Sequence, residues 1–335
     1  LLMENKIPLV SIIIPVYNSS SFILKTLNSL QKQTYENYEI IIINDGSTDN
    51  TNDILEEYNK KNCNVTLYYQ KNSGVSVARN KGIELSKGEF ITFLDSDDIY
   101  LPSFLEKLVS KQIQTNADLV YCGYNRISDS GKLTVIPCSF KEGNILDSYL
   151  QKNGYFHFSS ILIRKNILLK YSINFEAGCN LSEDLLFTVK LLSNFNCFSV
   201  KEHLFNYVQR VGSVMCSSWS DEKWIYDIQG RQKILNYLMD NYNKKDKQEI
   251  INLAMAWVVR REISYLIDCV RMMKYNQIKH YLSNSDFYNH AKNIDNSKLT
   301  KKDWKKYKII SKNNKAIWFF YTLYYRIFRL NLKIF

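Results

Sequence analysis

The chain has 335 residues, 45% of them hydrophobic, so it can bury a sizeable core in one large or two ordinary domains, and wholesale disorder is excluded. Its seven cysteines are scattered without a Cys-x-x-Cys pair, which excludes a disulfide framework and a cysteine-ligated zinc site and favours a reducing compartment. Most of the formal net charge of +11 comes from the end of the chain, because residues 298–335 carry 11 Lys and Arg against one acid, Asp303. Residues 1–9 lack the layout of a signal peptide, so we expect a cytoplasmic protein.

The first part of the chain alternates predicted strands with predicted helices. Val10–Pro15 is a continuous apolar run rich in β-branched residues, typical of a strand buried on both faces. The alternation predicts an α/β fold with a mostly parallel, Rossmann-like sheet flanked by helices. The predicted strands are 10–15, 38–44, 65–70, 89–94 and 118–123, and the predicted helices are 19–34, 49–60, 74–86 and 101–115.

Polar residues follow three of the predicted strands, at 15–18, 44–49 and 95–98. The carboxyl ends of parallel strands meet at one edge of a sheet, where ligands bind, so the three turns together indicate a site. In the last turn, three carboxylates within four positions repel one another unless a cation lies between them, and Mn²⁺ or Mg²⁺ prefers such oxygen ligands. The alternative for this turn alone is that Asp97 or Asp98 caps the helix that begins near Pro102.

Two common nucleotide-binding patterns are missing from the sequence. No G-x-G-x-x-G follows the first predicted strand, and no G-x-x-x-x-G-K-[ST] occurs anywhere in the chain. These observations exclude the Rossmann dinucleotide site and the P-loop.

Four motifs, over residues 10–18, 43–49, 74–82 and 93–98, resemble family 2 glycosyltransferases of the GT-A fold. The specific match covers roughly residues 8–125, and a weaker match continues to about residue 215. The resemblance implies a nucleotide-activated donor, usually a UDP-sugar. It also implies a GT-A catalytic domain over 1–216, with a nucleotide-binding half at 8–125 and an acceptor and base half at 126–216, followed by a helical region at 217–335.

The resemblance also implies roles for individual residues. Asp45 would hold the uracil, and Arg79 would lie near the base or the diphosphate, with a helix-surface ion pair as its alternative. Asp97, with Asp95, would bind the Mn²⁺ or Mg²⁺ ion on the diphosphate, whereas the role of Asp98 stays open. The implied nucleotide-sugar-binding residues are Pro15, Val16, Tyr17, Asn18, Asp45, Arg79, Asp95, Ser96 and Arg210.

The catalytic base has to come from another segment, because a metal-bound carboxylate is a poor base. The family places the base in an acidic pair that opens a helix, and residues 180–187 match this pattern, so we expect Asp184 to be the base. A single displacement with this base would invert the anomeric configuration. The structural alternative is that Asn180 and Glu183 form a capping box, since acids are favoured at helix N-termini.

Residues 207–213 resemble the loop that closes over the diphosphate in many members of the family. Arg210 is the natural cation of this loop, with an ordinary surface arginine as the alternative. The Gln-x-x-Arg-Trp motif of processive polysaccharide synthases is absent from the sequence, so we expect one sugar to be transferred per encounter.

The basic tail, 298–335, first suggests nucleic acid as a partner, but its end is also aromatic and apolar. Residues 316–325 carry no charge, and this run is far shorter than the roughly 20 residues that a spanning helix needs. We therefore predict an in-plane anchor on anionic lipid at the inner face of the cell membrane, rather than a nucleic-acid site. The alternative is a terminal helix docked on the protein's own core.

A tail of this kind beside a sugar transferase predicts a lipid-linked glycan as acceptor, as in capsule or other cell-surface polysaccharide synthesis. Two other classes compete with this interpretation. A nucleotidyltransferase on a similar fold would need a Gly-rich basic loop in place of residues 15–18. A catalytically inactive scaffold has no need to retain Asp45, Asp95, Asp97 and Asp184 together. The sugar, the acceptor hydroxyl, the choice of Mn²⁺ or Mg²⁺ and the oligomeric state stay open.

Overall fold

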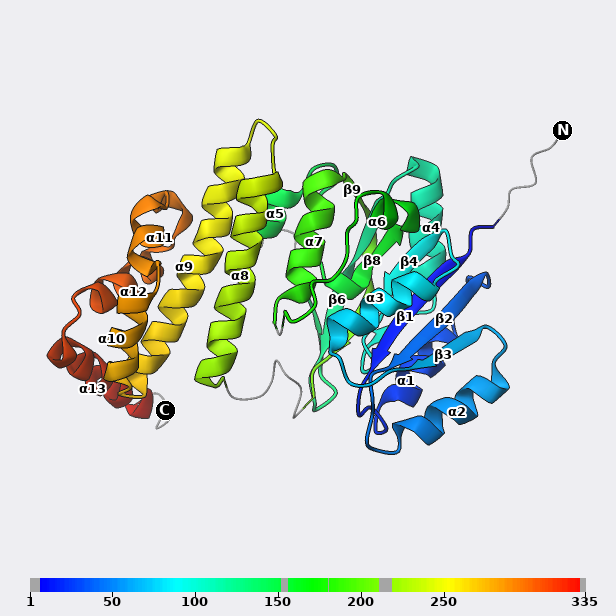
Figure 1. Cartoon of the computed structure of the whole chain (residues 1–335), viewed down its shortest axis with the longest axis horizontal. Helices are drawn as coiled ribbons and strands as arrows, with labels where there is room; N and C mark the ends of the chain where they lie inside the picture. Colours follow the sequence, from blue (N-terminus) through cyan, green and yellow to red (C-terminus); the bar gives the residue numbers. More distant parts are fainter. Residues whose placement is uncertain (1–6, 152–155, 180, 211–218, 332–335) are drawn as a thin grey trace. The chain divides into compact units, whose positions relative to one another are not determined.

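The computed structural model describes residues 7–151, 156–179, 181–210 and 219–331. The chain divides into two compact units, Leu1–Ser218 and Trp219–Phe335. Within the described ranges, the first unit combines a sheet with helices, and the second consists of helices (Figure 1).

The sheet of the first unit has the strand order β3-β2-β1-β4-β8-β6-β9-β5, with β7 paired to β6. β1 (Val10–Val16) runs parallel to β2 (Tyr38–Asn44) and to β4 (Phe90–Phe93), and β2 runs parallel to β3 (Val65–Tyr69). These four parallel strands confirm the predicted α/β architecture. The remaining strands are β5 (Ile99–Tyr100), β6 (Leu119–Ile127), β7 (Leu133–Val135), β8 (Ile161–Arg164) and β9 (Cys197–Val208).

The second half of the sheet departs from simple alternation. β8 lies between β4 and β6 and runs antiparallel to both of them. β6 and β9 are parallel, whereas β5 is antiparallel to β9. The pairing of β8 joins segments that are distant in the sequence, so local periodicity contains no signal for it.

Helices cover both faces of β1, which explains why every residue of this strand is buried. Ile12 and Ile14 belong to the same core cluster as Leu27 of α1 and Leu108 of α4. On the opposite face, α3 approaches so closely at Gly82 that an added Cβ would collide with the side chain of Ile13. The helices of this unit are α1 (Ile23–Leu30), α2 (Thr51–Lys61), α3 (Val75–Leu85), α4 (Phe104–Thr115), α5 (Leu146–Gln151), α6 (Lys165–Lys170) and α7 (Glu183–Asn194), with a 3-10 turn at Phe158–Ser160.

The first helix begins later than its predicted start at residue 19. The backbone N–H of Ser19 donates to Thr51 Oγ1 at 2.8 Å, and Ser20 Oγ donates to Asp49 at 2.7 Å. These serines therefore tie the first turn to the start of α2 and to the segment before it instead of capping α1, and helical geometry starts at Ile23.

The second unit is built around its longest helix, α9 (Lys247–Arg271), which contacts each of the other helices of the unit that the structure describes. None of the helices in the described ranges has the length and hydropathy needed to cross a bilayer. The other helices are α8 (Asp221–Asn241), α10 (Tyr275–Asn284), α11 (Phe287–Asn293), α12 (Lys301–Ser311) and α13 (Lys315–Asn331), with a 3-10 turn at Asn296–Lys298.

Candidate active site

The first and second polar turns are joined through Asn18, at the carboxyl edge of β1 and β2. Asn18 has a positive φ of 46°, a conformation that asparagine tolerates better than most residues. Its backbone N–H donates to Ser47 Oγ at 3.0 Å, and its side-chain oxygen accepts from the N–H of Thr48 at 2.8 Å. The side chain of Asn18 therefore fixes the relative position of the two turns.

Ser96 joins the first turn to the acidic turn after β4. Its hydroxyl lies 2.9 Å from that of Ser19, and its carbonyl oxygen accepts from Thr26 Oγ1 at 2.8 Å. The three polar turns that the sequence placed at this edge of the sheet are thus held together by direct hydrogen bonds.

Residues 15–17 have unequal access to a ligand. Pro15 and Val16 are buried at the end of β1, whereas the side chain of Tyr17 is 49% exposed. Of these three residues, Tyr17 is the one whose side chain is accessible from solvent, and its contact with the nucleotide stays a prediction.

The carboxylate of Asp45 is buried and holds the turn before α3. Its Oδ1 accepts from Gln70 Nε2 and from the N–H of Ser73, both at 2.8 Å, and its Oδ2 accepts from the N–H of Gly74 at 2.9 Å. Gly74 has a φ of 89°, which only glycine adopts at little cost. Asp45 therefore has a clear structural task here, and its contact with uracil stays a prediction.

The acidic turn contains a carboxylate that is closed off from water. Asp98 is fully buried; its Oδ1 accepts from the N–H of Val208 at 2.8 Å, while its Oδ2 has no hydrogen-bond partner in the described part of the chain. Burial, followed by the charges of Asp95 and Asp97, raises the pKa of Asp98 well above its ordinary value. The same two causes, burial and the charge of Asp95, raise the pKa of Asp97.

Arg210 supplies a positive charge to this turn. Its Nε donates to Asp97 Oδ2 at 2.7 Å, and its guanidinium lies 4.0 Å from the ring centroid of Phe22. The predicted closing loop continues into residues 211–213, which lie outside the described residues. Arg210 is thus beside the acidic turn, and its contact with a diphosphate stays a prediction.

Arg79, on α3, is a buried ion-pairing residue rather than a surface one. Its side chain is 4% exposed; Nη2 lies 2.9 Å from Asp95 and Nη1 lies 3.0 Å from Glu183. The guanidinium also lies over the rings of Phe158 and Phe175, at 5.0 and 5.2 Å. Burial lowers the pKa of Arg79, but the nearby carboxylates outweigh that effect and raise it.

This pair of bonds connects the acidic turn after β4 to the start of α7. Glu183 is therefore engaged with Arg79, and the proposed capping partner Asn180 lies outside the described residues. Ser182 precedes α7 with a φ of 69° and makes no side-chain capping bond. Sequence reasoning missed this bridge, because the two partners are 104 positions apart.

Asp184 lies in the first turn of α7, where its Oδ1 accepts from the N–H of Leu185 at 2.7 Å. Burial and the charge of Glu183 raise the pKa of Asp184 to about 7, although Arg79 opposes the shift. A carboxylate with such a pKa can accept a proton near neutral pH, which is the property required of a general base.

The acidic turn fits a divalent cation that is only partly enclosed by protein. Asp95 and Asp97 offer hard oxygen ligands, and the repulsion that raises the pKa of Asp97 would be relieved by a cation. Within the described ranges, no group of three His, Cys, Asp or Glu residues forms a complete metal site. Mg²⁺ usually takes one or two carboxylates and completes its shell with substrate phosphates and water, so Asp95 and Asp97 would hold it together with a bound diphosphate.

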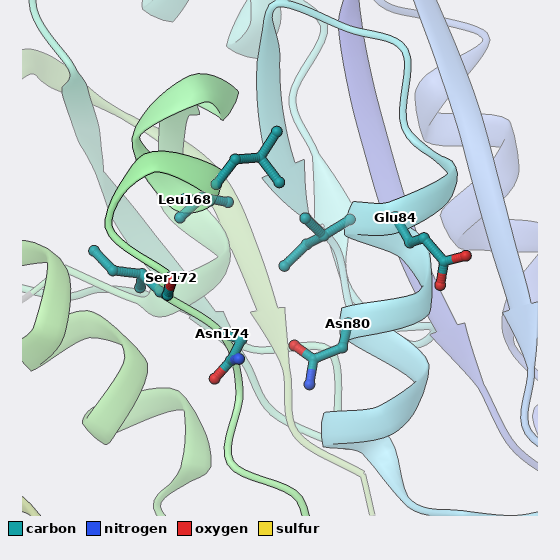
Figure 2. A pocket seen from close by; sticks show the side chains of 8 residues that line it. Asn80, Glu84, Leu168, Ser172 and Asn174 are labelled. Carbon is teal, nitrogen blue, oxygen red and sulfur yellow. The ribbon is translucent and has the colours of Figure 1, made fainter.

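A separate pocket of about 410 Å³ lies beside α3. Figure 2 shows Asn80 and Glu84 of α3 on one side and Ser172 and Asn174 of the segment after α6 on the other. Asn80 fixes this segment, because its amide accepts from the N–H of Phe175 at 2.9 Å and donates to the carbonyl oxygen of Phe175 at 2.8 Å. The residues that line the pocket include none of the predicted site residues.

Residues 11–172 match the model of the family described as glycosyl transferase family 2. Glycosyltransferase GlyG of Streptococcus pneumoniae is 27% identical over 285 residues, which cover 81% of this chain and 90% of GlyG. TarP of Staphylococcus aureus, a poly(ribitol-phosphate) beta-N-acetylglucosaminyltransferase, is 34% identical over 206 residues, which cover 59% of this chain and 62% of TarP. The matched region spans only 36% of EpsH and 40% of EpsJ, two relatives from Bacillus subtilis.

Among solved structures, residues 1–349 of Staphylococcus aureus TarS in complex with UDP-GlcNAc superpose with a TM-score of 0.65 at 20% identity, covering 90% of each chain. This likeness shows that the two proteins share a fold. Together with the family match and the four motifs, it confirms the predicted resemblance. Residues 11–172 therefore belong to glycosyl transferase family 2 and lie in a domain of the GT-A fold.

Proposed function

We propose that this protein transfers a single sugar from a UDP-sugar to a hydroxyl group of an acceptor, with inversion at the anomeric carbon. The observation that carries the proposal is the bridge through Arg79. It binds Asp95 of the acidic turn at 2.9 Å and Glu183, the neighbour of Asp184, at 3.0 Å. A carboxylate suited to metal binding and a carboxylate suited to proton transfer are thereby held in one rigid arrangement.

Two kinds of observation support a UDP-sugar as the donor. The three joined turns at the edge of the sheet leave Tyr17 exposed beside them. TarS has been solved with UDP and with UDP-GlcNAc, and TarP is named for transfer of N-acetylglucosamine. We therefore propose a UDP-activated hexose or N-acetylhexosamine as the substrate class.

Asp97, with Asp95, would hold a Mn²⁺ or Mg²⁺ ion, and such an ion, when bound, supplies Lewis-acid stabilisation of the charge that develops on the leaving diphosphate. Arg210 donates to Asp97 Oδ2, so this oxygen becomes a free ligand only when the arginine moves. The guanidinium released in this way can pair with the diphosphate, where its charge also favours departure of UDP.

Asp184 would act as the general base. The acceptor hydroxyl gives its proton to the carboxylate of Asp184 while its oxygen attacks the anomeric carbon, and the bond from that carbon to the diphosphate oxygen breaks. One displacement from the face opposite the leaving group inverts the configuration. Arg79 contributes by holding Glu183, and through it the first turn of α7, beside Asp95.

We further propose that the acceptor is a lipid-linked glycan of cell-surface polysaccharide synthesis, used at the inner face of the cell membrane. Two features support this assignment. GlyG and TarP are both named as sugar transferases, and the name of TarP couples this transfer to poly(ribitol-phosphate). In this chain, residues 298–335 carry the excess positive charge, which suits an anionic lipid surface.

The test is release of UDP from a panel of UDP-sugars by the full-length protein, with Mn²⁺, with Mg²⁺ and with chelator. We expect release from one donor in preference to the others, only when a divalent ion is present, and loss of release in Asp97→Ala. Release of pyrophosphate from a sugar phosphate and UTP would instead identify a nucleotidyltransferase. Tight, ion-dependent UDP binding without turnover of any donor, even with added membrane extract as a source of acceptor, would identify a scaffold.

A further inference from the structure

One face of α13 is docked on the second unit's own core. Trp318 and Thr322 are completely buried; Trp318 Nε1 donates to the carbonyl oxygen of Ile309 at 3.0 Å, and Thr322 Oγ1 donates to that of Val270 at 2.8 Å. The guanidinium of Arg271 lies 4.1 Å from the ring centroid of Tyr325. The helix is therefore fixed to α9 and α12 and is not a loose extension of the chain.

The opposite face of the same helix presents large apolar side chains to solvent. Phe319 is 43% exposed, Phe320 68%, Leu323 38% and Tyr324 60%. Their spacing places them in one stripe along the helix. Single exposed apolar side chains are ordinary, but a contiguous aromatic stripe marks a surface that another body covers. We call these four residues the aromatic face of α13.

Positive charges flank the aromatic face, and the sequence of the tail supplies one acid against them. Lys312 and Lys315 are exposed just before it, and Arg326 is exposed just after it. The one acid of residues 298–335, Asp303, is committed to a capping box with Thr300 at the start of α12. A covering partner therefore has to be both apolar and anionic.

A second copy of the chain that presents the same face does not meet this requirement. Two such surfaces brought face to face would bury the aromatic stripes but would oppose two basic segments, which repel each other. An anionic bilayer satisfies both demands at once, because aromatic side chains enter the interface while lysine and arginine pair with lipid headgroups.

We propose that the aromatic face of α13, with Lys312, Lys315 and Arg326, is a docking surface for an anionic lipid bilayer. In this proposal, one face of α13 stays packed on the core of its own unit while the opposite face contacts the membrane. The proposal rests on the proposed function in one respect: docking would bring the enzyme to a lipid-linked acceptor.

The experiment is co-sedimentation of the full-length protein with vesicles of pure phosphatidylcholine and with vesicles containing phosphatidylglycerol. We expect binding to the anionic vesicles, weakened by added NaCl because the lysine and arginine contribution is screened. The double variant Phe320→Ser/Tyr324→Ser should lower the partition coefficient about tenfold or more, since two large apolar side chains no longer enter the interface.

The matched control is Ile113→Ser/Leu133→Ser, which removes two side chains that are 55% and 53% exposed in the first unit. It should bind anionic vesicles like the wild type, and circular dichroism should show all three proteins equally folded. Absence of wild-type binding, equal binding to neutral vesicles, or unchanged binding of the double variant would each overturn the proposal.

Two further measurements distinguish membrane docking from self-association and from the proposed enzymatic function. Light scattering without vesicles tests the rival partner, since a dimer that dissociates in Phe320→Ser/Tyr324→Ser would mean that a second copy covers the face. UDP release in the absence of vesicles should be the same in the double variant and the wild type. If the wild type releases UDP but does not bind vesicles, only the docking surface is contradicted. If the wild type releases no UDP from any donor, the proposed function is contradicted.

Discussion

Arg79 has three neighbours whose chemistry depends on it: Asp95 on one side, Glu183 on the other, and Asp184 next to Glu183. The guanidinium is buried against Phe158 and Phe175, so water cannot replace it. The guanidinium is planar, permanently charged and able to contact two carboxylates through separate nitrogens. A lysine at this position could not do the same.

Replacing this guanidinium should therefore be costly. Arg79→Met leaves two partly buried carboxylates without their partner, and breaking a buried pair in this way typically destabilises a protein by about 3–5 kcal/mol. The measurement is urea unfolding. Lys81→Met on the same helix is the control, since it removes a surface pair with Glu84 and an exposed contact with the ring of Tyr68, and it should leave the urea midpoint close to that of the wild type. Equal stabilities of the two variants would show that the bridge contributes little.

The raised pKa of Asp184 predicts a pH dependence of catalysis. A general base works only when deprotonated, so UDP release should fall as the pH is lowered through about 7, the pKa of Asp184. The same shift affects the free energy of unfolding. Because the pKa of Asp184 is higher in the folded protein, between pH about 4 and about 7 the native state holds a proton that the unfolded chain has lost. The contribution of Asp184 to stability therefore falls as the pH rises through this range.

The measurement is the rate of UDP release between pH 5.5 and 8.5 at saturating donor, with UDP affinity followed over the same range. Constant affinity together with a falling rate assigns the effect to the chemical step. A flat rate profile would contradict the role given to Asp184.

At the scale of elements, α3 carries Arg79 into place because it packs unusually close to β1. Gly82→Ala would force a methyl group into Ile13, and overpacking of this kind costs about 1–3 kcal/mol. Thermal unfolding measures the loss, and Glu84→Ala, at an exposed position on the same helix, should be close to neutral. If Gly82→Ala were as stable as Glu84→Ala, the close packing of α3 on β1 would not be important for the fold.

The elements that local patterns specify were predicted well, and those that long-range pairing specifies were not. β1 and β2 follow from their runs of β-branched residues, and the turns after them follow from their polar residues. β8 enters the sheet between β4 and β6 through pairing that no local pattern encodes. In the site, the acidic turn and the start of α7 each have a sequence signature, but the Arg79 bridge between them is a contact over 104 positions and appears only in the folded chain.

At the scale of the whole molecule, charge and chemistry are divided between the two units. The polar turns, Arg79 and Asp184 belong to the first unit, and the excess of basic residues belongs to the second. Because Trp318 is buried in the core of the second unit, deletion of the tail would disturb that core as well as any membrane contact. Substitutions on the exposed face of α13 therefore test docking more cleanly than truncation does.

Trp318→Ala should lower the stability of the second unit by about 3–5 kcal/mol, as expected for a large side chain removed from a packed core. Phe320→Ala, on the exposed face of the same helix, is the control and should leave unfolding unchanged. Differential scanning calorimetry would show the shift. A Trp318→Ala transition at the wild-type temperature would mean that α13 is not docked on α9 as described.

The proposed role of Asp184 is tested by comparing the rate of UDP release in Asp184→Asn and in the wild type, using the donor that the UDP-sugar panel selects. The substitution keeps the size of the side chain and removes its ability to accept a proton. The variant should bind UDP with unchanged affinity in the presence of Mn²⁺ but release UDP from the sugar at least about a hundredfold more slowly. Near-normal release by Asp184→Asn would contradict the claim that the start of α7 supplies the catalytic base.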